Sequence, residues 1–191
     1  RDVVYAVPLE APGFYEDCDE PWAVNRYGLN LSSGREFVVN AFQRVRAAPD
    51  QMLAAPQVCC ELDYATRTDP NFSASLRFFA DRPGIFHGWL LWFDAELLDG
   101  IGFSNAPDQP ELVYGQAFFP LRQPLRVGSG DSLDLKIAAN LLSGNYVWRW
   151  ETLCSPASST TSPTAFKQSS LLGRLGLSAV VRRPDPAATP A

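Results

Sequence analysis

The chain has 191 residues, of which 46% are hydrophobic and 12% aromatic, so it is long enough and apolar enough to bury a sizeable core. Its formal net charge of −5 lacks the excess of positive charge that nucleic-acid binding requires, so a nucleic-acid partner is not expected. The longest apolar run, 85–93, is the length of a strand, and the N-terminus lacks the apolar stretch of a signal peptide. We therefore expect a cytoplasmic protein that does not enter a membrane.

The N-terminal segment predicts a strand followed by a short helix or turn. Asp2–Leu9 is apolar and β-branched and is followed by prolines, as is typical of a strand that ends there. The segment 14–22 is acidic and aromatic and predicts the short helix or turn. The chain starts with Arg1 rather than Met, so we expect it to be part of a longer protein.

An α-helical insertion is predicted at about 25–56. Phe37, Val38, Ala41, Phe42 and Val45 follow helical spacing, with arginines on the other faces. The segment 49–53 begins with a proline, which is tolerated in the first turn of a helix, and predicts a second short helix.

The pattern after residue 56 is β throughout. Turn signals rich in Gly, Pro, Asn and Asp separate short apolar runs, and this spacing indicates a sandwich or a barrel. The predicted strands are Val58–Tyr64, Ser73–Ala80, Ile85–Leu97, Glu111–Pro120, Leu125–Val127, Ser132–Ala139 and Tyr146–Thr152. In the third of these, the alternate residues Leu91, Phe93, Ala95 and Leu97 form an apolar face that suits a barrel interior.

The C-terminal part changes character again. The β domain is predicted to end at 154, and 155–191 to form a Ser/Thr/Pro linker and a partly disordered tail. Within it, 165–181 regains apolar residues that pack either on the barrel or on another domain.

The four cysteines are too few and too irregularly spaced for a disulfide framework. Cys59 and Cys60 are adjacent in a predicted strand, so their side chains are expected on opposite faces, where a bridge between them would be strained. We expect all four to be reduced thiols.

No constellation in the chain predicts catalysis. A single histidine and no Cys-x-x-Cys pair argue against a metal site, and His87 fits a core or rim histidine better than a catalytic one. Ser104 lacks the second glycine of a nucleophile elbow, and Asp94 and Glu96 are best explained as solvated residues of a barrel face. The turn 128–131 is not followed by a helix that would make a phosphate site.

An ordered series of motifs resembles the C-terminal half of the protein arginine methyltransferases and implies its fold. That fold is mainly β, an antiparallel β-barrel with an inserted α-helical dimerisation arm. The motifs are Trp22-Ala-Val-Asn-Arg-Tyr-Gly-Leu-Asn-Leu31, Phe86-His-Gly88, Trp92-Phe-Asp-Ala-Glu96, Gly102-Phe-Ser-Asn-Ala-Pro107, Tyr114-Gly-Gln-Ala-Phe-Phe119 and, as in bacterial members, Tyr146-Val-Trp-Arg-Trp150.

The resemblance implies site residues, and it also shows one departure. By position, Asn105, Val113, Tyr114 and Gln116 are expected at the substrate side, and Tyr27, Leu29, Phe37 and Phe42 in the dimer arm. The family's Thr-His-Trp loop matches Leu112-Val113-Tyr114, so the histidine is missing while an aromatic wall with a hydroxyl remains.

The implied function is that of the substrate-binding and dimerisation half of an S-adenosylmethionine-dependent methyltransferase. The family's donor-binding domain and its catalytic glutamates lie outside these residues, so this chain alone is expected to be inactive and to bind no cofactor itself. The expected partners are a protein or peptide arginine substrate and a second copy of the chain in a homodimer.

Two other interpretations remain open. Because no catalytic constellation is present, the chain also fits a stand-alone β-barrel ligand-binding module. Because the loop histidine is missing, it also fits the same half of a methyltransferase that acts on another amine or a small molecule.

Overall fold

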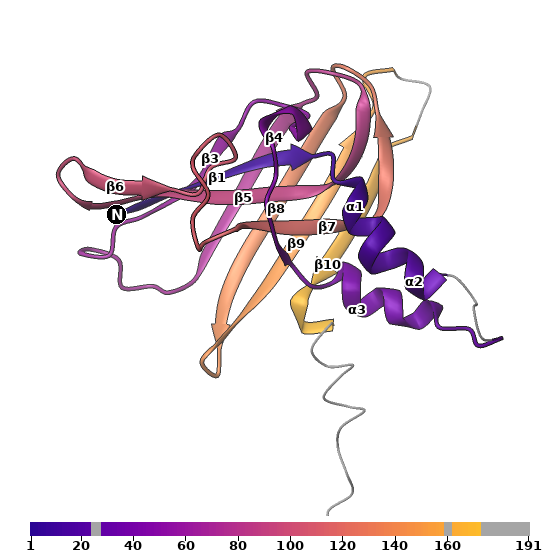
Figure 1. Ribbon diagram of the computed structural model, residues 1–191, viewed down its shortest axis with the longest axis horizontal. Helices are drawn as coiled ribbons and strands as arrows, with labels where there is room; N and C mark the ends of the chain where they lie inside the picture. Colours follow the sequence, from indigo (N-terminus) through magenta and orange to yellow (C-terminus); the bar gives the residue numbers. More distant parts are fainter. Residues whose placement is uncertain (24–27, 159–161, 173–191) are drawn as a thin grey trace, which may run out of the picture.

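The computed structural model describes residues 1–23, 28–158 and 162–172, and within them the chain is mainly antiparallel β (Figure 1). The strands are β1 (Asp2–Leu9), β2 (Gln43–Val45), β3 (Gln57–Leu62), β4 (Phe72–Phe79), β5 (Gly84–Leu98), β6 (Ile101–Ser104), β7 (Gln116–Val127), β8 (Ser132–Leu142), β9 (Asn145–Ser155) and β10 (Thr164–Ser169). The helices are α1 (Pro12–Phe14), the π-helical turn η1 (Tyr15–Asp19), α2 (Glu20–Ala23), α3 (Arg35–Val39) and the 3₁₀ turns η2 (Ser32–Gly34) and η3 (Pro49–Gln51).

The strands form two sheets. Sheet A has the order β2-β7-β5-β1-β3, with β6 added beside the far end of β5, and sheet B has the order β10-β9-β8-β4. In Figure 1 the strands of the two sheets run across one another, with the short helices at one end of sheet A and β6 with the N-terminus at the other. This arrangement confirms the predicted fold class, with the barrel wall made of two antiparallel sheets around one core.

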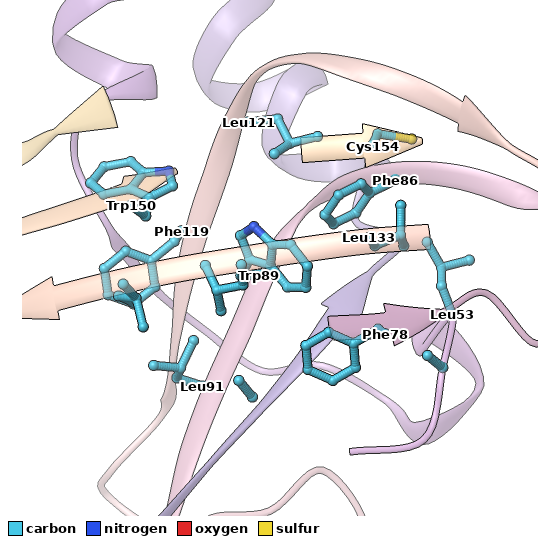
Figure 2. Close-up of a cluster of buried hydrophobic side chains, with 14 of the residues drawn as sticks. Leu53, Phe78, Phe86, Trp89, Leu91, Phe119, Leu121, Leu133, Trp150 and Cys154 are labelled. Atoms are coloured by element: carbon cyan, nitrogen blue, oxygen red, sulfur yellow. The ribbon is translucent and has the colours of Figure 1, made fainter. Parts of the chain in front are cut away.

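The core between the sheets is built around Trp89, at the centre of the side chains in Figure 2. Its ring lies 4.9 Å from the Phe86 ring and 5.4 Å from the Phe78 ring. Its indole Nε1–H donates a hydrogen bond of 2.8 Å to Thr152 Oγ1 in sheet B. A buried indole needs such a partner, so this contact satisfies Trp89 and joins the two sheets.

The middle of strand β5 is buried on both faces, whereas its last three residues are exposed, including Leu97, which was predicted to face the interior. Leu91 lies in the core between the sheets, as its alternation predicts, while Leu90 and Trp92 point to the opposite face. That opposite face is covered by α1 and η1, whose Phe14 and Tyr15 pack against it. The helices are therefore needed to keep the outer face of sheet A away from water.

The pairing of β5 with β7 is interrupted at one place. Phe86 pairs with Leu125 and Gly88 pairs with Pro120, so four residues of β7 lie opposite a single residue of β5. A Cβ on Gly88 would come within 2.4 Å of the Phe119 carbonyl oxygen, so no other residue fits there. The irregular segment joins two runs that the sequence predicted as separate strands.

Side chains donate hydrogen bonds to two carbonyls at this irregularity. Pro120 O accepts hydrogen bonds of 3.0 Å from Trp150 Nε1–H and 3.0 Å from Gln168 Nε2–H. Leu121 O accepts a bond of 2.6 Å from the hydroxyl of Tyr15. Three elements outside the ladder are therefore anchored to the same stretch of β7.

The predicted helical insertion is only partly helical. The helix predicted through Val45 ends at Val39, because the Asn40 side chain donates to the Glu36 carbonyl at 2.8 Å and the chain then turns into β2. Strand β2 pairs with β7, so the apolar residues of helical spacing are divided between a helix and a strand. The turn predicted after Pro49 is present as η3.

The β structure extends into the segment predicted as linker and tail. Strand β9 ends at Ser155, one residue beyond the predicted domain end, and β10 pairs with it along its whole length. Gln168 of β10 also donates a hydrogen bond of 2.5 Å to the carbonyl of Val39. The described part of this segment thus packs on the β domain, which is the first of the two alternatives stated for it, and 173–181 lie outside the described residues.

The expectation that Cys59 and Cys60 point to opposite faces is wrong. The pairing of β1 with β3 shifts by one residue, so that Val4 pairs with Cys60 while Tyr5 pairs with Val58. Cys59 is the extra residue of a β-bulge and is buried in the core, and Val4, the partner of Cys60, packs against the same core. Because directly paired residues share a face of a sheet, both thiols lie on the core side.

In the described ranges, no helix has the length and apolar character that crossing a membrane requires.

Candidate substrate-binding site

The candidate site is the loop between β6 and β7, residues 105–115. It starts where β5 changes partner, since the first part of β5 pairs with β7 and the last part pairs with β6. The loop therefore lies at the opening between these two strands, at the end of sheet A that also carries the N-terminus (Figure 1).

Asn105 and Gln116 hold the two ends of the loop together. Asn105 Oδ1 accepts a 2.8 Å hydrogen bond from the Phe93 amide, and its Nδ2 donates one of 2.8 Å to Gly115 O. Gln116 Nε2 donates to Asn105 O at 2.7 Å, and its Oε1 accepts from the Ala47 amide at 3.0 Å. Both side chains are buried, so they position the loop rather than offer polar groups to a ligand.

Val113 and Tyr114 are the exposed part of the loop. Val113 is 77% exposed and Tyr114 is 51% exposed. The Tyr114 ring is stacked on Phe103, with centroids 5.6 Å apart and an angle of 16° between the planes, and meets Phe93 edge-on at 6.1 Å. One aromatic face is thus held in a fixed position with its phenol near solvent.

Arg46 fixes the exposed part of the loop from the other side. Its guanidinium donates a hydrogen bond of 3.1 Å to Leu112 O and forms an ion pair with Glu111. A cavity of about 150 Å³ lies between Arg46, Tyr114 and the two residues that hold the loop ends together, Asn105 and Gln116. This volume suits one side chain or a small planar group rather than a drug-sized molecule.

Arg46 and Phe103 contribute to the site, although the sequence pattern did not indicate them. Arg46 was assigned to the polar face of a helix, and only the pairing of β2 with β7 brings it to the loop. Phe103 follows Gly102 in a motif that was noted, but its stacking with a residue eleven positions later has no local signal.

The other candidates lie apart from this loop or are used in its folding. His87 is buried, and its Nδ1 accepts a 3.0 Å hydrogen bond from the Ala11 amide. Burial lowers the pKa of His87, so the ring is neutral. Ser104 Oγ accepts a 3.0 Å bond from the Ala106 amide and caps the start of the loop.

Asp94 and the glycine-rich turn at 128–131 have contacts of their own within the fold. Asp94 lies near the Tyr5 hydroxyl, where burial, and after it the Asp94 charge, raise the pKa of Tyr5. In the turn at 128–131, the Asp131 carboxylate accepts hydrogen bonds from the Gly128 and Ala157 amides, both at 2.8 Å. The amides that a phosphate would need are therefore already bound.

The predicted arm residues have different environments. Leu29 is 61% exposed, Phe37 is half-buried, and Tyr27 lies outside the described residues. Phe42 is 43% exposed, yet its ring stacks on Phe119 at 5.5 Å and meets Trp148 at 5.8 Å. Part of the Phe42 side chain therefore packs within its own chain.

The helical segments of the described residues are short. α3 has five residues, and α1, η1 and α2 follow one another from Pro12 to Ala23. At the start of η3, Gln51 Oε1 accepts a 2.7 Å hydrogen bond from the Ala48 amide.

Comparison with known proteins agrees with this architecture. Residues 1–147 match the model of the arginine methyltransferase oligomerization subdomain. A 94-residue stretch, 49% of this chain and 26% of the relative, is 28% identical to an arginine N(omega)-methyltransferase of Streptomyces achromogenes subsp. streptozoticus.

Two solved structures share the fold over 88% of this chain. One is the Trypanosoma brucei PRMT1 enzyme-prozyme heterotetrameric complex with AdoHcy, with a TM-score of 0.71, 15% identity and 57% of that chain covered. The other is Arabidopsis thaliana protein arginine methyltransferase 10, with a TM-score of 0.67, 17% identity and 58% covered. The chain thus spans little more than half the length of these proteins and about a quarter of the curated relative.

The family model covers more than three quarters of the chain, and the two-sheet fold with its helical segment agrees with it. This chain belongs to the arginine methyltransferase oligomerization subdomain family, the C-terminal domain of that class of enzyme.

Proposed function

We propose that this chain is the substrate-side and dimerisation half of an S-adenosylmethionine-dependent methyltransferase that acts on arginine. The observation that carries the proposal is the family match over 1–147, together with the fixed, half-exposed aromatic face of Tyr114 at the position of the family's substrate loop. We infer that the donor is bound by residues outside this chain, since the chain covers little more than half of the similar methyltransferase chains.

Tyr114 has the chemistry that a guanidinium substrate requires. A guanidinium is planar and always charged, so it stacks favourably on an aromatic face, where the ring quadrupole attracts the cation. The stacked Phe103 ring and the ion-paired Arg46 hold Tyr114 and its loop in position before a substrate arrives. We infer that Tyr114 forms one wall against the acceptor arginine, and that Asn105 and Gln116 position this wall.

Free arginine is the second candidate substrate. The curated relative is named as an enzyme of arginine and of its ω nitrogen. The cavity beside Tyr114 is also small enough for a single side chain or a free amino acid. The alternative of a binding module without enzymatic activity is less favoured, because the family model that matches belongs to methyltransferases.

The test uses the complete gene product with a labelled methyl donor and two acceptors, an arginine-rich peptide and free arginine. We expect label on one of them, and Tyr114→Ala should lower kcat/KM by about tenfold or more while Tyr114→Phe stays within about threefold of the unchanged protein. Tyr146→Ala is the matched control, because Tyr146 is similarly exposed and lies on the β8–β9 hairpin.

Two results would contradict the proposal. Transfer to neither acceptor, with the donor bound, would exclude arginine as the substrate. Equal losses in Tyr114→Ala and Tyr146→Ala would mean that Tyr114 has no special role at the site.

A further inference from the structure

The bulge in β3 places two adjacent thiols side by side in one environment. Cys59 is the extra residue of the bulge and Cys60 pairs with Val4, so both side chains lie on the core face of the sheet. Adjacent residues of a regular strand point in opposite directions, and only the bulge allows this arrangement. All four cysteines of the chain are free thiols in the structure.

The two thiols differ in pKa and in accessibility. The neighbouring Cys59 thiol lowers the pKa of Cys60; burial opposes this effect, and the positive charge of Arg67 adds to the lowering. The neighbouring Cys60 and burial raise the pKa of Cys59. Cys60 is also the more accessible of the two, being half-buried where Cys59 is buried.

We propose that Cys59 and Cys60 form a modification site for hydroperoxides, which oxidise the pair to a reversible vicinal disulfide. Neither thiol takes part in the candidate substrate site, and the proposal is independent of the proposed function. Cys60 is the residue attacked by the oxidant and Cys59 is the resolving thiol.

The chemistry needs only one molecule of peroxide. The Cys60 thiolate attacks one peroxide oxygen, the O–O bond breaks, and hydroxide leaves and takes up a proton to become water, so that Cys60 becomes a sulfenic acid. Cys59 sulfur then attacks Cys60 sulfur, the S–O bond breaks, and the hydroxide leaves with the Cys59 proton as a second water. In sum, two thiols and one hydrogen peroxide give one disulfide and two waters.

The position in the fold explains why such a bond can form and why it is easily reduced. Consecutive Cα atoms are about 3.8 Å apart, closer than in most disulfides, so the backbone must adjust and the bond is strained. Among the described strands, β3 is the end strand of sheet A and pairs only with β1, so its bulge can change without breaking a second ladder. Strained disulfides have higher reduction potentials and are the labile ones.

The other thiols provide an internal comparison. Burial, and after it the Asp131 charge, raise the pKa of Cys154 to about 11, and burial also raises the pKa of Cys18. Their thiolate fractions at neutral pH are small, so slow oxidation is expected at both positions.

Trypsin makes the test direct. It cleaves after Arg46 and Arg67, so Cys59 and Cys60 fall in one peptide, 47–67, that contains no other cysteine. The full chain is treated with hydrogen peroxide and unreacted thiols are alkylated. We expect peptide 47–67 to lose two hydrogen masses at least about tenfold faster than Cys154 loses its alkylation, and to recover on treatment with a dithiol reductant.

Variants separate the two roles. In Cys59→Ser, Cys60 should accumulate as a sulfenic acid that dimedone traps, and in Cys60→Ser the disulfide should not form; Cys59→Ala replaces the serine variant if that one fails to fold. Cys154→Ser is the control and should leave the reaction unchanged. Disulfides between chains, oxidation of Cys60 to a sulfinic acid in the unchanged protein, or oxidation no faster than at Cys154 would each overturn the proposal.

Discussion

His87 connects the middle of β5 to the first helical turn. Its Nδ1 accepts a hydrogen bond of 3.0 Å from the Ala11 amide, its ring lies 5.4 Å from that of Tyr15, and the Tyr15 hydroxyl oxygen lies 3.1 Å from the His87 carbonyl oxygen. Because the acceptor nitrogen must stay unprotonated for the Ala11 contact, this part of the fold depends on a neutral ring.

The stability of the chain should therefore fall with acidification through the range of histidine. Burial lowers the pKa of His87 in the folded state, so below about pH 6.5 the unfolded chain takes up a proton that the folded chain does not. The stabilisation is complete above that pH and is lost as the pH falls toward the folded pKa. Urea unfolding at pH 7, 6 and 5 measures the effect, and His87→Asn, which keeps an acceptor that does not titrate, should flatten the slope. Equal slopes in both proteins would contradict this account.

At the same scale, three of the residues that the sequence assigned to the site line one cavity, but their environments differ. Tyr114 is exposed, whereas Asn105 and Gln116 use their polar groups on the backbone of Phe93, Gly115 and Ala47. Those contacts join residues far apart in the chain, so the spacing of motifs holds no information about them.

The elements that sequence analysis missed are short, and their neighbours define them. β2 has three residues, β6 has four and β10 has six, and each pairs with a longer strand. Apolar residues at 37–45 follow helical spacing, but pairing with β7 outweighs local propensity after Val39. The long strands β5, β8 and β9 were predicted because alternation over many residues is a strong signal.

The helical segment also shows where a second copy of the chain is expected to bind. Asp19 and Arg35 hold η1 against α3 through two hydrogen bonds of 2.6 and 2.7 Å, and Trp22 packs over Gly34, where a Cβ would lie 2.0 Å from its ring. This framework carries Leu29 and Leu31, both exposed, and we propose that they form the apolar tip of the arm.

Substituting the tip should separate the dimer without unfolding the chain. Leu29→Asp with Leu31→Asp places two charges in the proposed interface, while both positions are exposed within the chain, so we expect a monomeric mass by light scattering and an unchanged thermal midpoint. Phe42→Asp is a poorer test, because Phe42 also packs on Phe119. Leu141→Asp with Leu142→Asp on the β8–β9 hairpin is the matched control. A dimer that persists in the tip variant would refute this placement of the interface.

At the scale of the whole molecule, the irregular stretch of β7 is the place where the two sheets and the helical segment meet. Pro120 O accepts from Trp150 of β9 and from Gln168 of β10, and Gln168 also donates to Val39 at the end of α3. The Pro120 carbonyl is thus a common acceptor for elements that are distant in sequence. The sequence predicted two strands there, and the joint between them follows only from tertiary contacts.

The shared acceptor Pro120 O predicts that the effects of substitutions at its two donors on the unfolding free energy are not additive. Trp150→Phe removes one donor to Pro120 O and some buried area, and Gln168→Ala removes the other donor; we expect each to cost about 1–3 kcal/mol of unfolding free energy. In the double variant the buried carbonyl loses both donors, so its cost should exceed the sum of the two by about 1 kcal/mol. Urea unfolding of the four proteins of the cycle measures this coupling.

The control cycle pairs Gln168→Ala with Trp89→Phe. Trp89 lies in the same core, but its indole donates to Thr152 Oγ1, a partner that Gln168 does not share. In this control cycle, the losses of unfolding free energy in the two single variants should add up to the loss in the double variant to within about 0.5 kcal/mol. If the Trp150 cycle is equally additive, Pro120 O does not couple the two sheets, and the helical segment and β10 are held to sheet A by packing alone.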